Sequence, residues 1–161
     1  MKNIFVIVLC LLDVLFAGSF KDSRDGKVYK TVKIGDQIWM AQNLNYDMKE
    51  SGCYGNSERN CKKYGRLYSW HAARFACPNG WHLPDKMEWD ELYDNVGGFE
   101  IAAKMLKSKK IWKKDDSGVD AYGFSALPAG EVRSGSFWGL GFAVYFWTSS
   151  VHVEKKSSMA S

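Results

Sequence analysis

The chain lacks the motifs that mark many enzymes and the long apolar runs of membrane proteins. Its 161 residues contain no Gly-x-Gly-x-x-Gly or Walker phosphate loop and no Gly-x-Ser-x-Gly serine-hydrolase motif. Three scattered histidines and four cysteines do not predict a metal site, and no cofactor is expected. No apolar run reaches the roughly twenty residues that span a bilayer. These absences favour a binding or structural role over catalysis.

The chain also lacks a strong excess of one charge. Its formal net charge is +4, and basic residues alternate with acids, as in Lys113-Lys114-Asp115-Asp116, instead of lining one stripe. Nucleic-acid binding is therefore not expected. What the chain does have is aromatic side chains, with seven Trp, eight Tyr and nine Phe. This apolar content predicts one folded domain with a real core, not a disordered chain.

The N-terminus differs in kind from the rest of the sequence. A basic start at Met1-Lys2-Asn3 is followed by the apolar run Ile4–Phe16 and by the small residues Ala17-Gly18-Ser19. This order predicts a signal peptide over residues 1–19, cleaved after Ala17 or Ser19. We therefore expect a secreted or bacterial cell-surface protein with no transmembrane span after signal removal.

Export changes how the remaining cysteines are interpreted. In an oxidising compartment thiols usually pair. Cys53 and Cys61 flank a polar, turn-prone segment that a disulfide could close into a small loop. Cys77 is then left as a free or unpaired thiol.

The first half of the domain reads as strands and loops followed by a helix. Alternating apolar residues around the turn pair Gly35-Asp36 predict a hairpin of Lys27–Ile34 and Gln37–Leu44. Residues 45–64 are polar and loop-like. Apolar residues at helical spacing predict a short helix over residues 67–76, ended by Pro78-Asn79-Gly80.

Two further helices are predicted in the middle of the chain. Asp85 and Glu88 have the spacing of a capping box, and they precede a helix over Lys86–Asn95 that ends at Gly97-Gly98. A second helix is expected over Phe99–Leu106. Beyond it, the apolar pieces at residues 122–127 and 143–147 are expected to be strands, separated by a Gly- and Ser-rich loop. Residues 151–161 show no pattern and are expected to be an unstructured tail.

Histidine and tryptophan are the candidate functional residue types. His82, between Trp81 and Leu83, is interpreted as a packed residue whose ring nitrogens bond to the backbone. Trp112 and Trp138 lie in polar or Gly-rich sequence, so these two residues and the neighbouring Phe137 are the candidate binding residues. Five other tryptophans lie in apolar sequence and are expected to fill the core; they are Trp39, Trp70, Trp81, Trp89 and Trp147.

Five ordered blocks of the sequence form a distinctive series. They are Asp25–Tyr46, Tyr64–Trp70, Cys77–Pro84, Gly123–Gly130 and Phe146–Ser150. The series resembles the Fibrobacter succinogenes major paralogous domain (FISUMP), a family of exported bacterial domains without an established biochemical role.

This resemblance implies an α+β fold over residues 20–150. The expected domain is single, loop-rich and C-type-lectin-like, with a small antiparallel sheet and two to three short helices. The lectin calcium signature is absent from the chain, so calcium-dependent sugar binding is not expected. Family members usually continue into a further strand with a cysteine that would suit Cys77, so the resemblance also predicts a truncated C-terminal end.

The expected function is that of an exported, non-enzymatic surface or recognition module for carbohydrate or a cell-surface protein. Two alternatives stay open. One is a hydrolase-like or modifying enzyme that uses His82 and Glu88. The other is a truncated, inactive paralogue.

Overall fold

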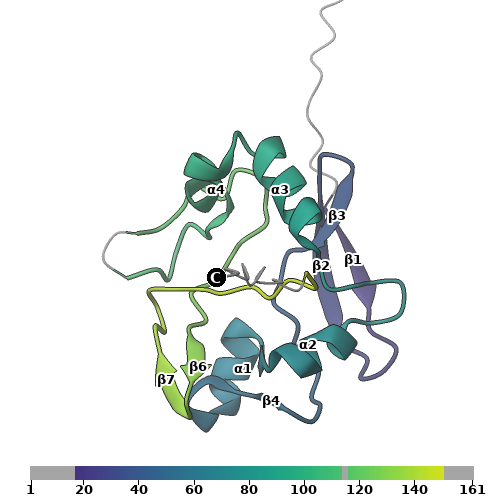
Figure 1. Cartoon of the computed structure of the whole chain (residues 1–161), viewed down its shortest axis with the longest axis vertical. Coiled ribbons are helices and arrows are strands. Elements are labelled where there is room, and N and C mark those ends of the chain that lie inside the picture. The colour runs from purple at the N-terminus through teal and green to yellow at the C-terminus, as the bar shows by residue number, and fades with distance from the viewer. Residues whose placement is uncertain (1–16, 114–115, 151–161) are drawn as a thin grey trace, which may run out of the picture.

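The structure is a computed structural model that describes residues 17–113 and 116–150 (Figure 1). Strands β1 (Ala17–Lys21), β2 (Val28–Ile34) and β3 (Gln37–Met40) form an antiparallel sheet in the order β1-β2-β3. The other elements are β4 (Ser51–Gly52), the 3-10 helix η1 (Tyr54–Asn56), α1 (Glu58–Tyr64), β5 (Leu67–Tyr68), α2 (Trp70–Ala76), α3 (Lys86–Asn95), α4 (Phe99–Leu106), β6 (Glu131–Arg133) and β7 (Ser136–Trp138). The predicted α+β class with small antiparallel sheets is confirmed, while its likeness to C-type lectins stays a prediction.

The predicted N-terminal hairpin is confirmed, with a shorter second strand. Gly35 has a φ of 59° in the turn between β2 and β3, a conformation that glycine adopts without strain. Strand β1 was not expected, because its first three residues fall within the predicted signal peptide. It pairs with β2 from Ala17↔Val32 to Lys21↔Val28. Residues 1–16 of the predicted signal peptide lie outside the described residues, so the cleavage position stays a prediction.

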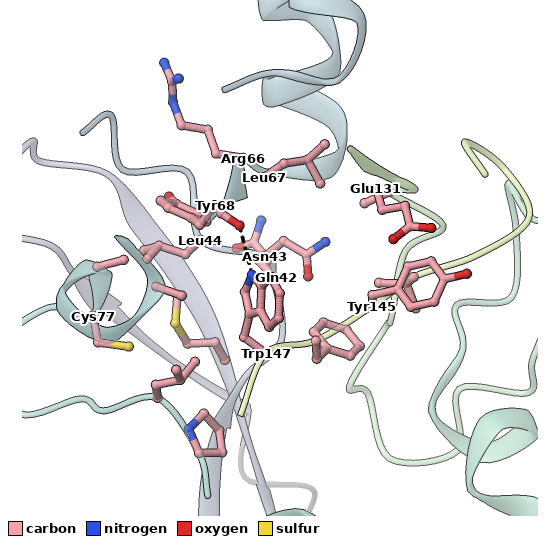
Figure 2. Close-up of a pocket in the computed structure, with 18 of the residues that line it drawn as sticks. Gln42, Asn43, Leu44, Arg66, Leu67, Tyr68, Cys77, Glu131, Tyr145 and Trp147 are labelled. Carbon is pink, nitrogen blue, oxygen red and sulfur yellow. Dashed lines mark hydrogen bonds between the residues drawn. The ribbon is translucent and has the colours of Figure 1, made fainter. Parts of the chain in front are cut away.

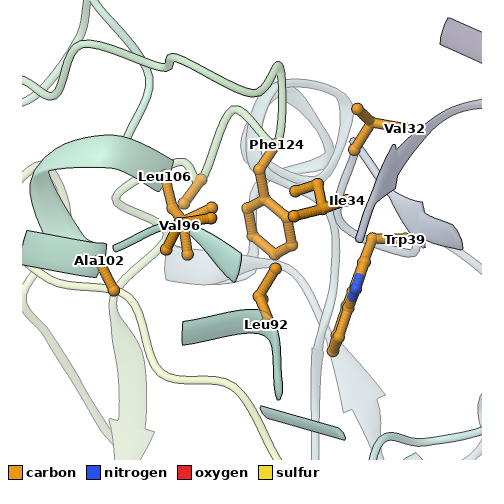
Figure 3. Packing of buried hydrophobic residues seen from close by; sticks show 9 residues of the cluster. Val32, Ile34, Trp39, Leu92, Val96, Ala102, Leu106 and Phe124 are labelled. Atoms are coloured by element: carbon orange, nitrogen blue, oxygen red, sulfur yellow. The ribbon is translucent and has the colours of Figure 1, made fainter. Parts of the chain in front are cut away.

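The hydrophobic core lies between the sheet and helices α3 and α4 (Figure 3). Leu92 of α3 and Val96, directly after the helix, are almost completely buried, at 0% and 1% exposure. They pack with Val32 of β2 and Trp39 of β3, and the Trp39 and Phe124 rings lie 6.0 Å apart. A β-strand exposes its two faces alternately, and here Val32, Ile34 and Trp39 share the face that the helices cover.

Helices α3 and α4 have the predicted bounds, Lys86–Asn95 and Phe99–Leu106. The capping box is confirmed. The Glu88 backbone N–H donates to Asp85 Oδ1, and the Asp85 backbone N–H donates to Glu88 Oε2, both at 2.9 Å. These two bonds satisfy N–H groups at the helix start that have no partner within the helix.

The prediction for residues 45–76 was wrong in two places. The segment expected to be a loop contains β4, η1 and helix α1. The helix expected from residue 67 begins at Trp70, because the Ser69 hydroxyl accepts a bond from the Ala72 backbone N–H and so caps the helix there. Leu67 and Tyr68 instead pair with β4.

The strand prediction for the last part of the chain was also wrong. Residues 122–127 and 143–147 form only the isolated bridges Lys107↔Ala126 and Gly130↔Val144. The expected Gly- and Ser-rich loop instead holds the hairpin β6–β7. Ser134 and Gly135 have φ values of 50° and 76°, the positive angles that a tight two-residue hairpin turn requires.

The last described residues cross the middle of the molecule and contact α2 and the start of α3 (Figure 1). Trp70 Nε1 donates to the Thr148 carbonyl oxygen at 3.1 Å, and the Ser149 backbone N–H donates to the Pro84 carbonyl oxygen at 2.9 Å. The predicted tail, residues 151–161, lies outside the described residues. Within residues 17–113 and 116–150, α3 is the longest helix at ten residues, and no helix has the length and hydropathy to cross a bilayer.

Candidate functional site: a central aromatic cleft

A cleft of about 1450 Å³ opens in the middle of the described structure (Figure 2). Strand β3 and the segment that follows it line one part, and β5 and α2 line another. The hairpin strand β6, residues 144–147, the segment before α3 and residues 124–130 contribute further lining. Its walls therefore come from segments far apart in the sequence.

Three consecutive aromatic side chains line this cleft and stay accessible to solvent. Tyr145, Phe146 and Trp147 are 61%, 43% and 48% exposed. Trp147 was expected to fill the core, and that prediction was wrong. Its indole Nε1 donates to the Tyr68 carbonyl oxygen at 2.8 Å (Figure 2). This bond fixes the ring in the cleft instead of in the core. Phe146 also contacts Trp89, with ring centroids 5.5 Å apart.

Amide and hydroxyl groups beside these rings are held by the backbone. Gln42 Oε1 accepts a bond from the Lys30 N–H, and Asn43 Nδ2 donates to the Tyr64 carbonyl oxygen, both at 2.8 Å. Tyr68 donates its hydroxyl to the Tyr46 carbonyl oxygen at 2.8 Å, and burial raises the pKa of Tyr68 well above its usual value. The Tyr68 hydroxyl therefore stays neutral at physiological pH.

Charged side chains at the cleft are paired with each other or with neighbours. Arg133 meets Glu131 at 2.9 Å, and Arg66 meets Asp47 at 2.7 Å. Glu50 Oε2 accepts a bond from the Ser69 hydroxyl at 2.7 Å, and this bond lowers the pKa of Glu50. The cleft thus combines an apolar surface with paired charges, while Arg66 Nε is a buried donor with no hydrogen-bond partner among the described residues.

The predicted disulfide between Cys53 and Cys61 is present, with the two Cα atoms 5.0 Å apart. Glu58 lies beside it, and the two sulfurs and a Glu58 oxygen all lie within 4.8 Å of one another. Because the disulfide uses both sulfurs, neither is a thiolate that could bind a metal. Cys77 forms no disulfide with another described residue and lines the cleft, and burial raises the pKa of its thiol. Cys77 is therefore a weak nucleophile at neutral pH.

His82 is not the packed residue that its sequence context predicts. Its side chain is 71% exposed, and Nε2 lies 2.6 Å from Glu88 Oε1 at the edge of the cleft. Glu88 uses its other oxygen in the capping box. The pair has the contact that a catalytic histidine and carboxylate would need, yet it also completes the start of α3. The hydrolase-like alternative therefore stays a prediction.

The three predicted binding residues have different environments. Trp112 is only 7% exposed, its Nε1 donates to the Ala126 carbonyl oxygen at 3.1 Å, and it offers no open ring face to a ligand. Phe137 packs against Tyr54, with ring centroids 5.0 Å apart, and lines the cleft. Trp138 is 59% exposed. Trp112 and Trp138 therefore do not form one exposed surface.

Trp138 belongs to a second, smaller hollow of about 460 Å³ on the hairpin. The register pairs Glu131 with Trp138 and Arg133 with Ser136, so these four side chains share one face of β6–β7. Val132 and Phe137 point to the opposite face.

Sequence reasoning missed the principal cleft because its residues carry no local signal. Tyr145, Phe146 and Trp147 form an apolar run that looks the same whether it is buried or open. Only the tertiary contacts of Trp147 with Tyr68 separate the two outcomes.

The geometry defines a small, disulfide-bonded α+β domain built around an aromatic cleft. The chain belongs to the Fibrobacter succinogenes major domain family, whose match covers residues 32–161. No curated protein and no solved structure matches the chain significantly.

Proposed function

We propose that this chain is an exported recognition module that binds a cell-surface protein through the central cleft. One observation carries the proposal: Tyr145, Phe146 and Trp147 place three half-exposed rings side by side in the sequence along that cleft. Protein-binding surfaces are enriched in aromatic residues that bury large areas on association.

The size of the cleft supports a macromolecular partner. Small-molecule pockets usually measure about 300–1,000 Å³, whereas this cleft measures about 1450 Å³. Its charged side chains already have partners, as Glu131 and Arg133 illustrate. An uncharged, largely apolar ligand surface complements such a cleft better than a charged metabolite does.

Export is part of the same proposal. It rests on the basic, apolar and small-residue order of residues 1–19 and on the disulfide Cys53–Cys61, a bond that persists in oxidising compartments. The mature N-terminus of protein secreted from a bacterial host, read by mass spectrometry, tests it. Recovery of an uncleaved chain from the cytoplasm would contradict export.

Binding of fluorescently labelled chain to intact bacterial cells tests the cleft. We expect the double variant Tyr145→Ala/Trp147→Ala to lose at least about tenfold in binding, because each truncated aromatic anchor costs about 1–2 kcal/mol. Trp138→Ala is the matched control, since it removes an equally exposed ring outside this cleft. Mild protease treatment of the cells should abolish binding. Equal binding by the cleft variant, with an unchanged melting temperature, would overturn the proposal.

Carbohydrate binding is a second candidate, and the hairpin face favours it. Trp138 presents an exposed ring beside the Glu131–Arg133 ion pair and Ser136, a combination of stacking surface and hydrogen-bonding groups that suits a sugar. In the same assay, periodate oxidation of cell-surface glycans and Trp138→Ala would then abolish binding, while protease treatment would not.

A further inference from the structure

Strand β3 lies at the edge of the sheet. The alternation of hydrogen-bonded and non-bonded residue pairs along β2–β3 fixes which backbone groups of β3 point away from β2. The Ala41 N–H donates to the Lys30 carbonyl oxygen, so these two residues face each other across the β2–β3 ladder. Antiparallel ladders alternate between bonded and non-bonded pairs. Trp39 and Gln37 of β3 therefore also bond toward β2, whereas Ile38 and Met40 direct their N–H and C=O groups away from it.

The β1–β2 ladder gives the same alternation independently. The Asp22 N–H donates to the Lys27 carbonyl oxygen at the end of the β1–β2 ladder. Counting in steps of two from that pair, the backbone groups of Tyr29 and Thr31 bond to β1. Those of Lys30, Val32 and Ile34 therefore point toward β3. Both ladders thus assign the same outward groups to β3.

The outward edge of β3 opens into the central cleft. All four residues of β3 line the cleft, together with Gln42, Asn43 and Leu44 further along the chain. Among residues 17–113 and 116–150, no backbone hydrogen bond reaches the N–H or C=O groups of Ile38 and Met40. An unpaired strand edge of this kind is a template for another strand.

The charges of the cleft limit what can fill it. Glu131 with Arg133, and Arg66 with Asp47, are already paired, so a neutral backbone complements the site better than a charged ligand. The chain's own residues 151–161 come two residues after Ser149, which bonds to the cleft residue Pro84. A strand in an apolar cleft needs apolar residues at every second position. That segment has Val151 and Val153 in this spacing, but Lys155 and Ser157 follow.

We propose that the cleft binds an extended segment of a separate polypeptide as an added strand beside β3. The Ile38 and Met40 backbone groups bond to the added strand, and its apolar side chains, two residues apart, lie against rings such as Trp147. This inference rests on the proposed function and specifies the form of the protein ligand.

Hydrogen exchange with a model peptide tests the inference. The probe is a capped peptide, Ser-Val-Thr-Val-Ser-Val-Thr-Val-Lys, and its control has the same side chains with alternate backbone nitrogens methylated. We expect the probe to slow exchange of the Ile38 and Met40 amides about tenfold or more, and the methylated peptide to slow neither. No saturable binding up to about 1 mM, or binding that leaves both amides unprotected, would overturn the inference.

A pair of variants at position 38 separates backbone pairing from side-chain contact. Ile38→Pro removes an N–H that β2 does not use, so an edge strand tolerates it. It should weaken the probe about tenfold, since it removes one hydrogen bond and blocks close approach of the added strand. Ile38→Thr keeps the N–H and should weaken the probe less. Equal loss in both variants would contradict strand addition, whereas the proposed function would still stand if the unmodified chain binds cells.

Discussion

The core and the cleft, which meet at strand β3, use the same kinds of residue in opposite ways. On the core side, Trp39 is 8% exposed and packs with Leu92 and Phe124. On the cleft side, Ile38 is 63% exposed, and the cleft holds the half-exposed rings of residues 145–147. Burial of apolar area stabilises the fold in proportion to the area removed from water. The core side therefore carries the stability, and the cleft side leaves apolar area available for a partner.

The largest test of this division is the deletion of a core side chain. Leu92→Ala should lower the free energy of unfolding by about 3 kcal/mol, because Leu92 is 0% exposed and its loss leaves a cavity. Urea denaturation followed by circular dichroism measures the change. Met87→Ala on the same helix is the control: Met87 is 77% exposed, and its change should stay within about 0.5 kcal/mol. If both variants lost a similar free energy of unfolding, the distinction between core and surface would not hold.

Removing the disulfide tests how far the stability of the cleft side depends on a covalent bond. Replacing Cys53 and Cys61 together by alanine should lower the free energy of unfolding by about 2.5 kcal/mol, the chain-entropy value for a loop this short. Thermal unfolding with and without a reducing agent gives the same comparison on the unmodified chain. Cys77→Ala is the control, because within residues 17–113 and 116–150 Cys77 forms no disulfide. A reductant that leaves the melting temperature unchanged would count against a stabilising disulfide.

The sequence predicted the core side better than the cleft side, for a physical reason. The capping box of Asp85 and Glu88 and the helix after it depend on neighbours a few residues away, so the pattern was sufficient. The hairpin at Ser134-Gly135 was missed because its residues also suit an ordinary loop. Trp112 was misjudged because its burial depends on a bond to Ala126, fourteen residues away.

The cleft could not be predicted at all from local pattern. It needs β3, β5 and residues 144–147 to meet, and no periodicity in the sequence encodes that meeting. The bond from Trp147 to the Tyr68 carbonyl oxygen spans 79 residues. Such distant contacts decide whether an apolar run becomes core or binding surface.

A pH series tests the ion pair of the buried Asp22 with Arg24 in the loop between β1 and β2. The hydrogen bond from Arg24 holds the pKa of the buried Asp22 carboxyl below its usual value. A lowered folded-state pKa stabilises the fold above the unfolded pKa, and that stabilisation is lost as the pH falls through the folded pKa. The free energy of unfolding should therefore drop as the pH falls below about 4.

Two variants assign that acid response. Asp22→Asn should remove this part of the pH dependence, because the amide does not titrate. Arg24→Ala should cost about 2 kcal/mol at neutral pH, since it leaves a buried carboxylate without its guanidinium partner. An Asp22→Asn variant with the same slope between about pH 2 and 4 would place the acid response in other groups.

The smallest expected effect is also the sharpest comparison, because the same substitution is made at a core tryptophan and at a cleft tryptophan. Trp39→Phe should cost about 2 kcal/mol, since it leaves a gap in the core and removes the bond from Nε1 to Gln37 Oε1. Trp147→Phe removes a similar bond, to the Tyr68 carbonyl oxygen, but from a half-exposed ring that leaves no closed cavity. Its cost should stay near 0.5–1 kcal/mol, the net value of one hydrogen bond. If urea denaturation gave equal costs for the two variants, Trp147 would be a core residue after all, and the cleft would lose the fixed ring on which its proposed role depends.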